Sequence, residues 1–186
     1  MSIALLALRL VTGLLFMGHG LQKLVPAKYS PPLLKATGPR PLAGFFEQLG
    51  LRPGLATVVL AGLGELGGGL LLASGLVTPL ATLLLAAVMT TAILSVHIRK
   101  GIWNTDGGIE LPLTYLTIAF VVTAVGPGTL SIDAWAGISN WVGIHWAASE
   151  VVRSGAAVGI GVAAGLATMA VGRARIALDR RAPNPV

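Results

Sequence analysis

The stretch GLATVVLAGLGELGGGLLLASGLVTPLATLLLAAVMTTAILSVHI, from Gly54 to Ile98, decides the fold of this chain. It holds one carboxylate, Glu65, and neither lysine nor arginine. A helix needs about 20 apolar residues to cross the hydrocarbon core of a bilayer, and this stretch is long enough for two such helices. It therefore predicts membrane spans at residues 54–77 and 80–98, joined by a tight turn at Thr78 and Pro79.

The composition of the whole chain agrees with a membrane protein. Its 186 residues are 54% hydrophobic and 11% charged, with a mean hydropathy of +0.82, whereas soluble domains carry about 25% charged residues. The net charge of +6 comes from basic residues in the connections between apolar runs, where such residues set membrane topology. We therefore expect a lipid bilayer around this chain and no nucleic acid. The absence of cysteine excludes disulfides, thiol catalysis, iron–sulfur clusters and cysteine-ligated zinc.

Two more apolar runs complete a predicted four-helix core over residues 1–126. The first covers residues 3–24 and is followed by no small-residue cleavage site, so we interpret it as a retained helix and not a signal peptide. The other covers about residues 109–125 and stops at the turn sequence GPG. Between the first and second spans, the amphipathic sequence PLAGFFEQLGL is expected to rest at the membrane interface.

The rest of the chain adds three predicted segments. Residues 127–154 are amphipathic and hold three of the four tryptophans, which favours an interfacial segment. Residues 155–172 are rich in alanine and glycine and are long enough for a fifth span; a helix packed on the bundle surface is the alternative. Residues 173–186 form a basic tail. GxxxG spacings in the predicted fifth span indicate a homodimer contact at Gly155/Gly159 and Gly161/Gly165.

The distribution of lysine and arginine predicts the orientation. With five spans, eleven of these residues fall on one side, in the first loop, the third loop and the tail, and only Arg153 falls on the other. Cytoplasmic loops carry the excess of basic residues. We therefore predict a multi-pass protein with the N-terminus outside and the C-terminus in the cytoplasm.

The sequence GLGELGG contains the spacing Gly62-x-Gly64-x-x-Gly67 of dinucleotide-binding loops. That motif works at a helix N-terminus after a strand, where free backbone N–H groups contact the pyrophosphate. Here the glycines lie in the middle of a predicted membrane helix, so their N–H groups are already used. Close helix packing through Gly64 and Gly68 is the better interpretation.

A largely polar stripe follows one face of the first predicted span. At about 100° per residue, its members fall within a quarter of the helix circumference; they are Arg9, Thr12, Phe16, His19 and Lys23. A charge in the middle of a membrane costs about 3 kcal/mol or more, so this face is expected to meet protein or water. The alternative is that Arg9 and Lys23 reach the headgroups from the two ends of the helix.

Glu65 lies midway along the second predicted span, too deep for its short side chain to reach bulk water. It must be paired, protonated or exposed to a wet cavity. Arg9 is the candidate partner, because both residues fall in the outer half of the bundle if their helices pack together. Two interpretations stay open: a buried Glu–Arg clamp between helices, or a group that exchanges protons or contacts a ligand.

A candidate site is predicted where the first span ends, the third ends and the fourth begins. The residues expected at this depth are His19, Lys23, His97, Arg99, Trp103, Asn104 and Glu110. A histidine exchanges protons near neutral pH, a carboxylate or lysine beside it can relay them, and a tryptophan offers an aromatic face. The alternative for His97 is an ordinary interfacial histidine, and His145 receives no role. Two histidines without a carboxylate triad are weak evidence for metal or haem, and we expect neither.

With these residues the chain resembles the DoxX family of bacterial membrane proteins. The similar pieces, between Leu8 and Val125, are LRLVTGLLFMGHGLQKL, GFFEQLGL, LAGLGELGGGLLLASGLVTPLATLLLAAVM, VHIRKGIWN and GGIELPL. The resemblance implies a four-helix core in the bacterial plasma membrane. It also implies a link to redox chemistry, because relatives include a quinone-reducing subunit of a thiosulfate oxidoreductase and membrane subunits of oxidative-stress complexes.

The leading hypothesis that follows is a membrane subunit of an oxidoreductase or oxidative-stress complex that binds a quinone in the helical bundle. The alternative is a non-catalytic scaffold that recruits soluble redox enzymes to the inner face. The catalytic candidates are His19, Lys23, Glu65, His97 and Glu110, and the ligand-binding candidates are Arg9, Phe16, Trp103 and Asn104.

Overall fold

The computed structural model describes residues 2–137 and 150–180, and the regular elements within those residues are helices. Four helices are long and apolar enough to cross a membrane, and Glu110–Val125 is a shorter apolar helix. These helices confirm the expected all-α fold of a multi-pass membrane protein. The long candidate spans are Ile3–Leu24, Gly54–Ser74, Thr78–Lys100 and Val152–Asp179. The α-helices are α1 (Ser2–Leu24), α2 (Pro39–Gln48), α3 (Gly54–Ser74), α4 (Thr78–Ala92), α5 (Glu110–Val125), α6 (Ile132–Ala136) and α8 (Glu150–Asp179).

Helices α1 and α3 pack antiparallel through glycine. Gly13 of α1 lies against Gly69 of α3. Seven residues further along α1, or about two helical turns, Gly20 lies against Gly62. A Cβ atom added to Gly13 would lie 2.5 Å from the carbonyl oxygen of Gly69. The two backbones therefore approach each other more closely than any larger residue would allow, as in many membrane helix pairs.

Helix α4 turns back along α3 and carries the centre of the core. The turn between them uses left-handed backbone at Gly75 and Val77. On the α3 side, Gly64 faces Val88 and Gly68 faces Leu85, so these two glycines serve helix packing. The core residues come from several helices and include Phe16, Leu72, Leu85, Met89 and Val122. Thr82 of α4 donates a hydrogen bond of 2.8 Å to the carbonyl of Ala119, which ties α5 to α4.

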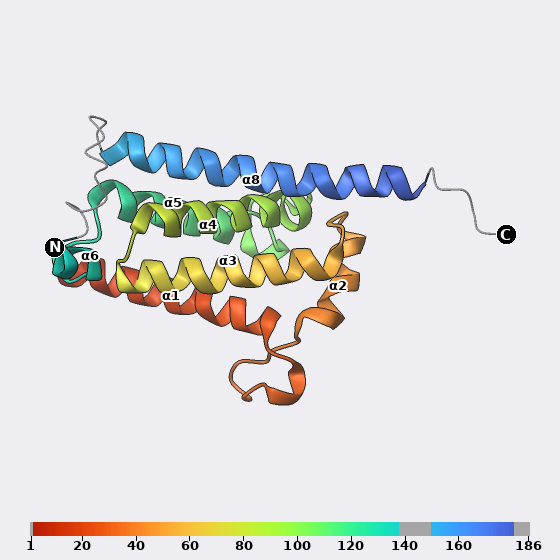
Figure 1. Ribbon diagram of the computed structural model, residues 1–186, viewed down its shortest axis with the longest axis horizontal. Coiled ribbons are helices and arrows are strands. Elements are labelled where there is room, and N and C mark those ends of the chain that lie inside the picture. Colours follow the sequence, from red (N-terminus) through yellow and green to blue (C-terminus); the bar gives the residue numbers. More distant parts are fainter. Residues whose placement is uncertain (1, 138–149, 181–186) are drawn as a thin grey trace.

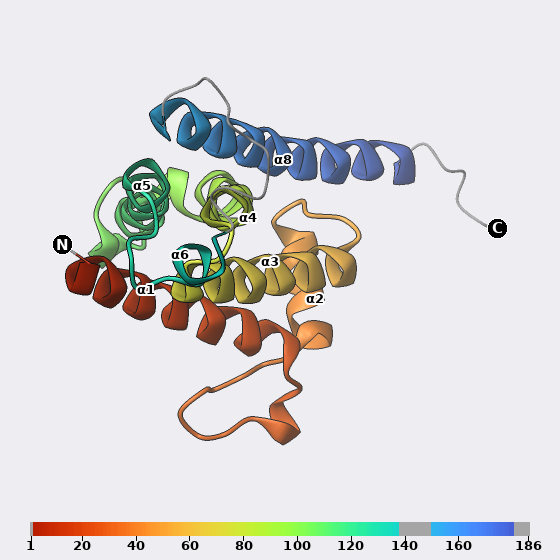
Figure 2. The same cartoon turned by 60° about the vertical axis from the view of Figure 1, so that its left-hand side comes forward.

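Helix α8 lies along α4 and α5, on the side of the bundle away from α1 (Figures 1 and 2). Gly161 packs on Ala86 of α4, and Gly165 packs on Thr90, so α8 and α4 run in the same direction. This GxxxG pair is used within the chain and is not free for a dimer, in contrast to our expectation. The other pair, Gly155 and Gly159, has open space around it.

Two short segments cover the ends of the bundle. Helix α2, which contains the predicted amphipathic piece, packs against α3 near the start of that helix. At the opposite end, α6 lies beside the N-terminal part of α1 (Figure 1). Of the predicted interfacial segment 127–154, residues 138–149 lie outside the described residues, as do His145 and tail residues 181–186.

Candidate functional site

An ion pair between the end of α1 and the middle of α3 lies at the centre of the candidate site. The Nζ atom of Lys23, in the last turn of α1, lies 2.6 Å from Oε2 of Glu65 in the middle of α3. The side chain of Glu65 is 6% exposed and that of Lys23 is 20% exposed. Glu65 is therefore paired, which is one of the three states that its depth allowed, and its partner is Lys23 and not Arg9.

The direction of helical side chains explains this pairing. Side chains on an α-helix lean toward its N-terminus. Because α1 and α3 are antiparallel, the C-terminal end of α1 lies beside the N-terminal half of α3. The Lys23 side chain therefore leans back into the bundle, and the Glu65 side chain leans toward the end of the bundle that holds the backbone of Lys23. The long lysine side chain therefore reaches a carboxylate about two turns deeper than its own backbone, which snorkelling toward headgroups would not achieve.

Arg9 lies at the opposite end of the bundle, because fourteen residues separate it from Lys23 and correspond to about 21 Å along a helix. Its side chain is fully buried. The guanidinium lies against Gly75 and donates a hydrogen bond through Nη2 to the carbonyl oxygen of Leu130. Asp133 of α6 is close enough for a Coulombic attraction. Arg9 thus holds the turn before α6 and contributes nothing to the cavity described next.

A cavity of about 410 Å³ lies beside the Lys23–Glu65 pair. Side chains from α1, α2, α3, α4 and α5 contribute to its walls. The walls are mostly apolar and aromatic, and Phe16 contacts Tyr115 edge-on with ring centroids 5.1 Å apart. The titratable residues and the amide among the lining residues are His19, Lys23, Glu65, His97, Tyr115 and Asn104.

His97 reaches the cavity from the irregular end of the candidate span Thr78–Lys100, which begins with α4 and is called the α4 span below. The helix widens into a π-helical turn over Ile93–His97, a feature that re-aims side chains and is frequent at functional sites. The ring Nδ1 lies 2.6 Å from the carbonyl oxygen of Gly107. Because a carbonyl oxygen only accepts, Nδ1 carries a proton and donates it. The Nε2 atom of a neutral His97 is then an acceptor.

The remaining site predictions have different outcomes. Phe16, His19 and Asn104 line the cavity. Glu110 is absent from its lining; its carboxylate accepts a hydrogen bond of 2.8 Å from the backbone N–H of Asn104 and thereby holds the loop before α5. Trp103 is 65% exposed and also outside the cavity.

Sequence reasoning missed several lining residues. Phe45 and Phe46 of α2, which were expected to rest at the interface, also line the cavity. Tyr115 of α5 and Ser95 of the π-helical turn also line it. The amphipathic pattern of α2 identified which face is apolar, but an apolar face meets lipid and protein equally well, so the pattern did not show what that face covers.

Within the part of the chain that the structure describes, no three histidine, aspartate or glutamate side chains gather closely enough to hold a metal ion. The polar residues that line the cavity instead supply one ion pair, two imidazoles, a phenol, an amide and the hydroxyls of Thr57, Thr91, Ser95 and Thr168. Such a set can donate and accept hydrogen bonds and transfer protons.

Comparison with known proteins identifies the family. A family model described as DoxX matches residues 4–98, just over half of the chain. The matched region covers nearly all of α1, the whole of α3 and nearly all of the span Thr78–Lys100, and hence Lys23, Glu65 and His97. No curated protein sequence and no solved structure matches the chain significantly. On the family match, this chain belongs to the DoxX family of membrane proteins.

Proposed function

We propose that this protein is the membrane subunit of an oxidoreductase or oxidative-stress complex, and that its cavity binds a quinone. The observation that carries the proposal is the Lys23–Glu65 pair, which faces a cavity that is otherwise largely apolar. Small-molecule sites are typically apolar hollows with a few placed polar groups. A clamp that only joined two helices would have no need of such a cavity beside it.

The lining residues fit the chemistry of a quinone. Aromatic walls, including Phe16 and Tyr115, suit a flat ring, and the apolar wall of α2 suits a hydrocarbon tail. The Lys23 ammonium can donate a hydrogen bond to a ring oxygen, and Glu65 holds that ammonium in place. His97 can accept a proton at Nε2 while Gly107 fixes its ring.

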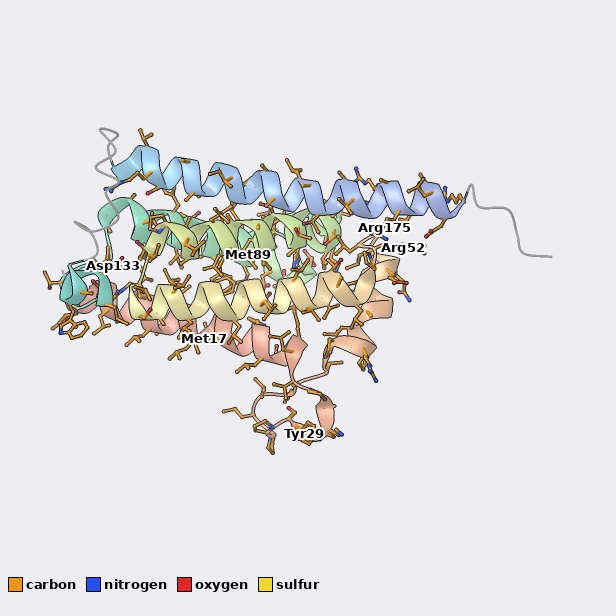
Figure 3. All side chains as sticks on the ribbon, viewed as in Figure 1. Met17, Tyr29, Arg52, Met89, Asp133 and Arg175 are labelled. Atoms are coloured by element: carbon orange, nitrogen blue, oxygen red, sulfur yellow. The ribbon has the colours of Figure 1, made fainter. Side chains whose placement is uncertain are left out.

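Quinone reduction supplies the redox step when the ligand is bound, and it takes two electrons and two protons. Lys23 and His97 are the groups that would hold or move protons at Nζ and Nε2. The electrons would come from a reduced substrate or from a soluble redox partner. We expect such a partner to dock at the end of the bundle that carries Arg52 and Arg175 (Figure 3), which the excess of basic residues assigns to the cytoplasm.

Quinone binding by the purified, full-length protein tests the proposal. Dissociation constants are measured for a short-tailed benzoquinone and naphthoquinone, with the matching alkylbenzene as a ligand that lacks the ring oxygens. We expect Glu65→Gln to weaken quinone binding by about tenfold or more, because the hydrogen bond to a charged group at Lys23 loses its support. Binding of the alkylbenzene should not change.

Asp179→Asn is the matched control. It removes a carboxylate from the other described ion pair, in which Arg52 Nη1 lies 2.7 Å from Asp179 Oδ2, outside the cavity. This variant should bind quinone as the native protein does. If neither quinone binds the native protein better than the alkylbenzene, the quinone proposal is wrong. Pulldown of soluble redox enzymes that survives Glu65→Gln would then favour the scaffold.

A further inference from the structure

A second cleft, of about 370 Å³, lies between the end of the α4 span and α8. It shares no lining residue with the quinone-binding cavity. Two of its lining residues are arginines, and its apolar residues come from both helices. The residues that matter here are Leu94, Ile98, Arg99, Leu166, Met169 and Arg173.

The parallel packing of α4 and α8 brings the two arginines to one depth. Gly165 of α8 packs beside Thr90 of α4. Arg173 follows Gly165 by eight residues and Arg99 follows Thr90 by nine, which correspond to about 12 and 14 Å along a helix. Both arginines are near the ends of their candidate spans, Thr78–Lys100 and Val152–Asp179. They therefore lie at headgroup level.

The positive charge in this cleft lacks a counter-ion from the described residues. Among the described residues the ion pairs are Lys23–Glu65 and Arg52–Asp179, and neither involves Arg99 or Arg173. Both arginine side chains are exposed to solvent. Two like charges that share a cleft repel each other, and an anion between them removes that repulsion.

The apolar part of the cleft selects among anions. Met169 is buried, and Leu166, about two turns further from the helix end than Arg173, is 51% exposed. Leu94 lies deeper along the α4 span than Arg99. Below the charged rim the cleft is thus lined by hydrocarbon at the depth of lipid acyl chains. A free inorganic anion has nothing to place against that surface, whereas a lipid has a chain.

We propose that this cleft binds an anionic phospholipid, with its phosphate between Arg99 and Arg173 and an acyl chain along Leu94, Leu166 and Met169. Basic pockets between membrane helices bind lipid headgroups in this way. Guanidinium groups suit phosphate, because their N–H groups can bond two oxygens at once. The net negative charge of the lipid matters, since a zwitterionic headgroup would bring its own cation to the two arginines.

Lipid titration of the purified, delipidated full-length protein tests this site. The midpoint of thermal unfolding is followed against short-chain phosphatidylglycerol, phosphatidylcholine and inorganic phosphate. Phosphatidylglycerol should raise the midpoint of the native protein, and the other two should leave it nearly unchanged. In Arg99→Gln/Arg173→Gln the apparent affinity for phosphatidylglycerol should fall about tenfold or more.

Arg175→Gln/Arg180→Gln is the matched control, because it removes the same number of positive charges from the same end of the bundle, at exposed positions outside the cleft. It should respond to phosphatidylglycerol as the native protein does. Equal loss of response in both double variants would overturn the site in favour of general attraction to basic residues. An equal response to phosphatidylcholine or to inorganic phosphate would also overturn it. Quinone binding should be the same in both double variants, so failure here is separate from failure of the quinone proposal.

Discussion

Lys23 and Glu65 meet across the glycine-rich contact between α1 and α3, with 2.6 Å between Nζ and Oε2. The pair joins the last turn of one helix to the middle of the other and faces the cavity. A pair so placed has two roles that experiments can separate: it neutralises a carboxylate inside the bundle, and it offers a cationic donor to a ligand.

Replacement of one member of this pair should lower stability, whereas replacement of both should leave it nearly unchanged. Lys23→Met leaves the Glu65 carboxylate buried without a cation, so the free energy of unfolding should fall by about 3 kcal/mol. Lys23→Met/Glu65→Met removes both charges and should return to within about 1 kcal/mol of the native value, because buried ion pairs rarely stabilise more than apolar residues of similar size. Reversible denaturation in mixed micelles measures both. A single variant as stable as the native protein would show that the pair is not buried in the membrane.

The glycine contact makes a second prediction. Gly20→Ala places a Cβ 2.6 Å from the backbone of α3, so it should lower the free energy of unfolding by about 1–3 kcal/mol. Gly18, two residues earlier, has open space around it, and Gly18→Ala should have no cost. The same denaturation assay compares them. Equal behaviour of the two variants would mean that α1 and α3 are not in close contact at Gly20.

Conservative variants of His97 distinguish the roles of its two ring nitrogens. The amide nitrogen of asparagine can occupy the place of Nδ1, so His97→Asn should keep the hydrogen bond to Gly107 and the native thermal midpoint. It has no atom at the place of Nε2, so its affinity for the reduced quinol, whose hydroxyl would donate a hydrogen bond to Nε2, should fall. His97→Gln should show the reverse loss, with a lower midpoint. If His97→Asn binds the quinol normally, His97 only anchors the loop.

The contact between Asp133 of α6 and the turn that joins α3 to α4 can be tested at the other end of the bundle. Asp133 accepts a hydrogen bond of 3.0 Å from the backbone N–H of Val77 and lies near Arg9. Asp133→Asn keeps an acceptor for Val77 and removes only the charge, so it should cost about 1 kcal/mol of stability. Quinone affinity should not change, because this contact is remote from the cavity. A loss of quinone affinity with full stability would indicate coupling between the two ends.

The sequence was sufficient to predict the helices, because apolar runs of membrane length admit few other structures. The hairpin of α3 and α4 followed from the same reasoning, whereas the depth of Glu65 left its paired state as one of three alternatives. The partner of Glu65 was predicted wrongly. Depth estimates placed Arg9 near it, but they ignored the antiparallel register and the direction in which the side chains lean.

Long-range contacts explain the other differences. Arg9 bonds the carbonyl of Leu130, a contact between residues 121 positions apart for which the polar stripe on α1 gave no signal. The amphipathic pattern of α2 predicted an interfacial position for its aromatic residues and gave no signal that Phe45 and Phe46 also line the cavity. Glu110 was predicted to be a site residue because it is a carboxylate at the start of the fourth predicted span. Its hydrogen bond from the backbone N–H of Asn104 depends on the backbone geometry of the loop, which the sequence does not show.

The quinone affinity of Lys23→Met/Glu65→Met in lipid nanodiscs tests the central claim most directly, because this variant should be folded and lack only the polar contact. We predict that this double variant has a native thermal midpoint and binds quinone about tenfold or more weakly than the native protein. A folded double variant that binds quinone with native affinity would contradict it, and the Lys23–Glu65 pair would then be a clamp between helices.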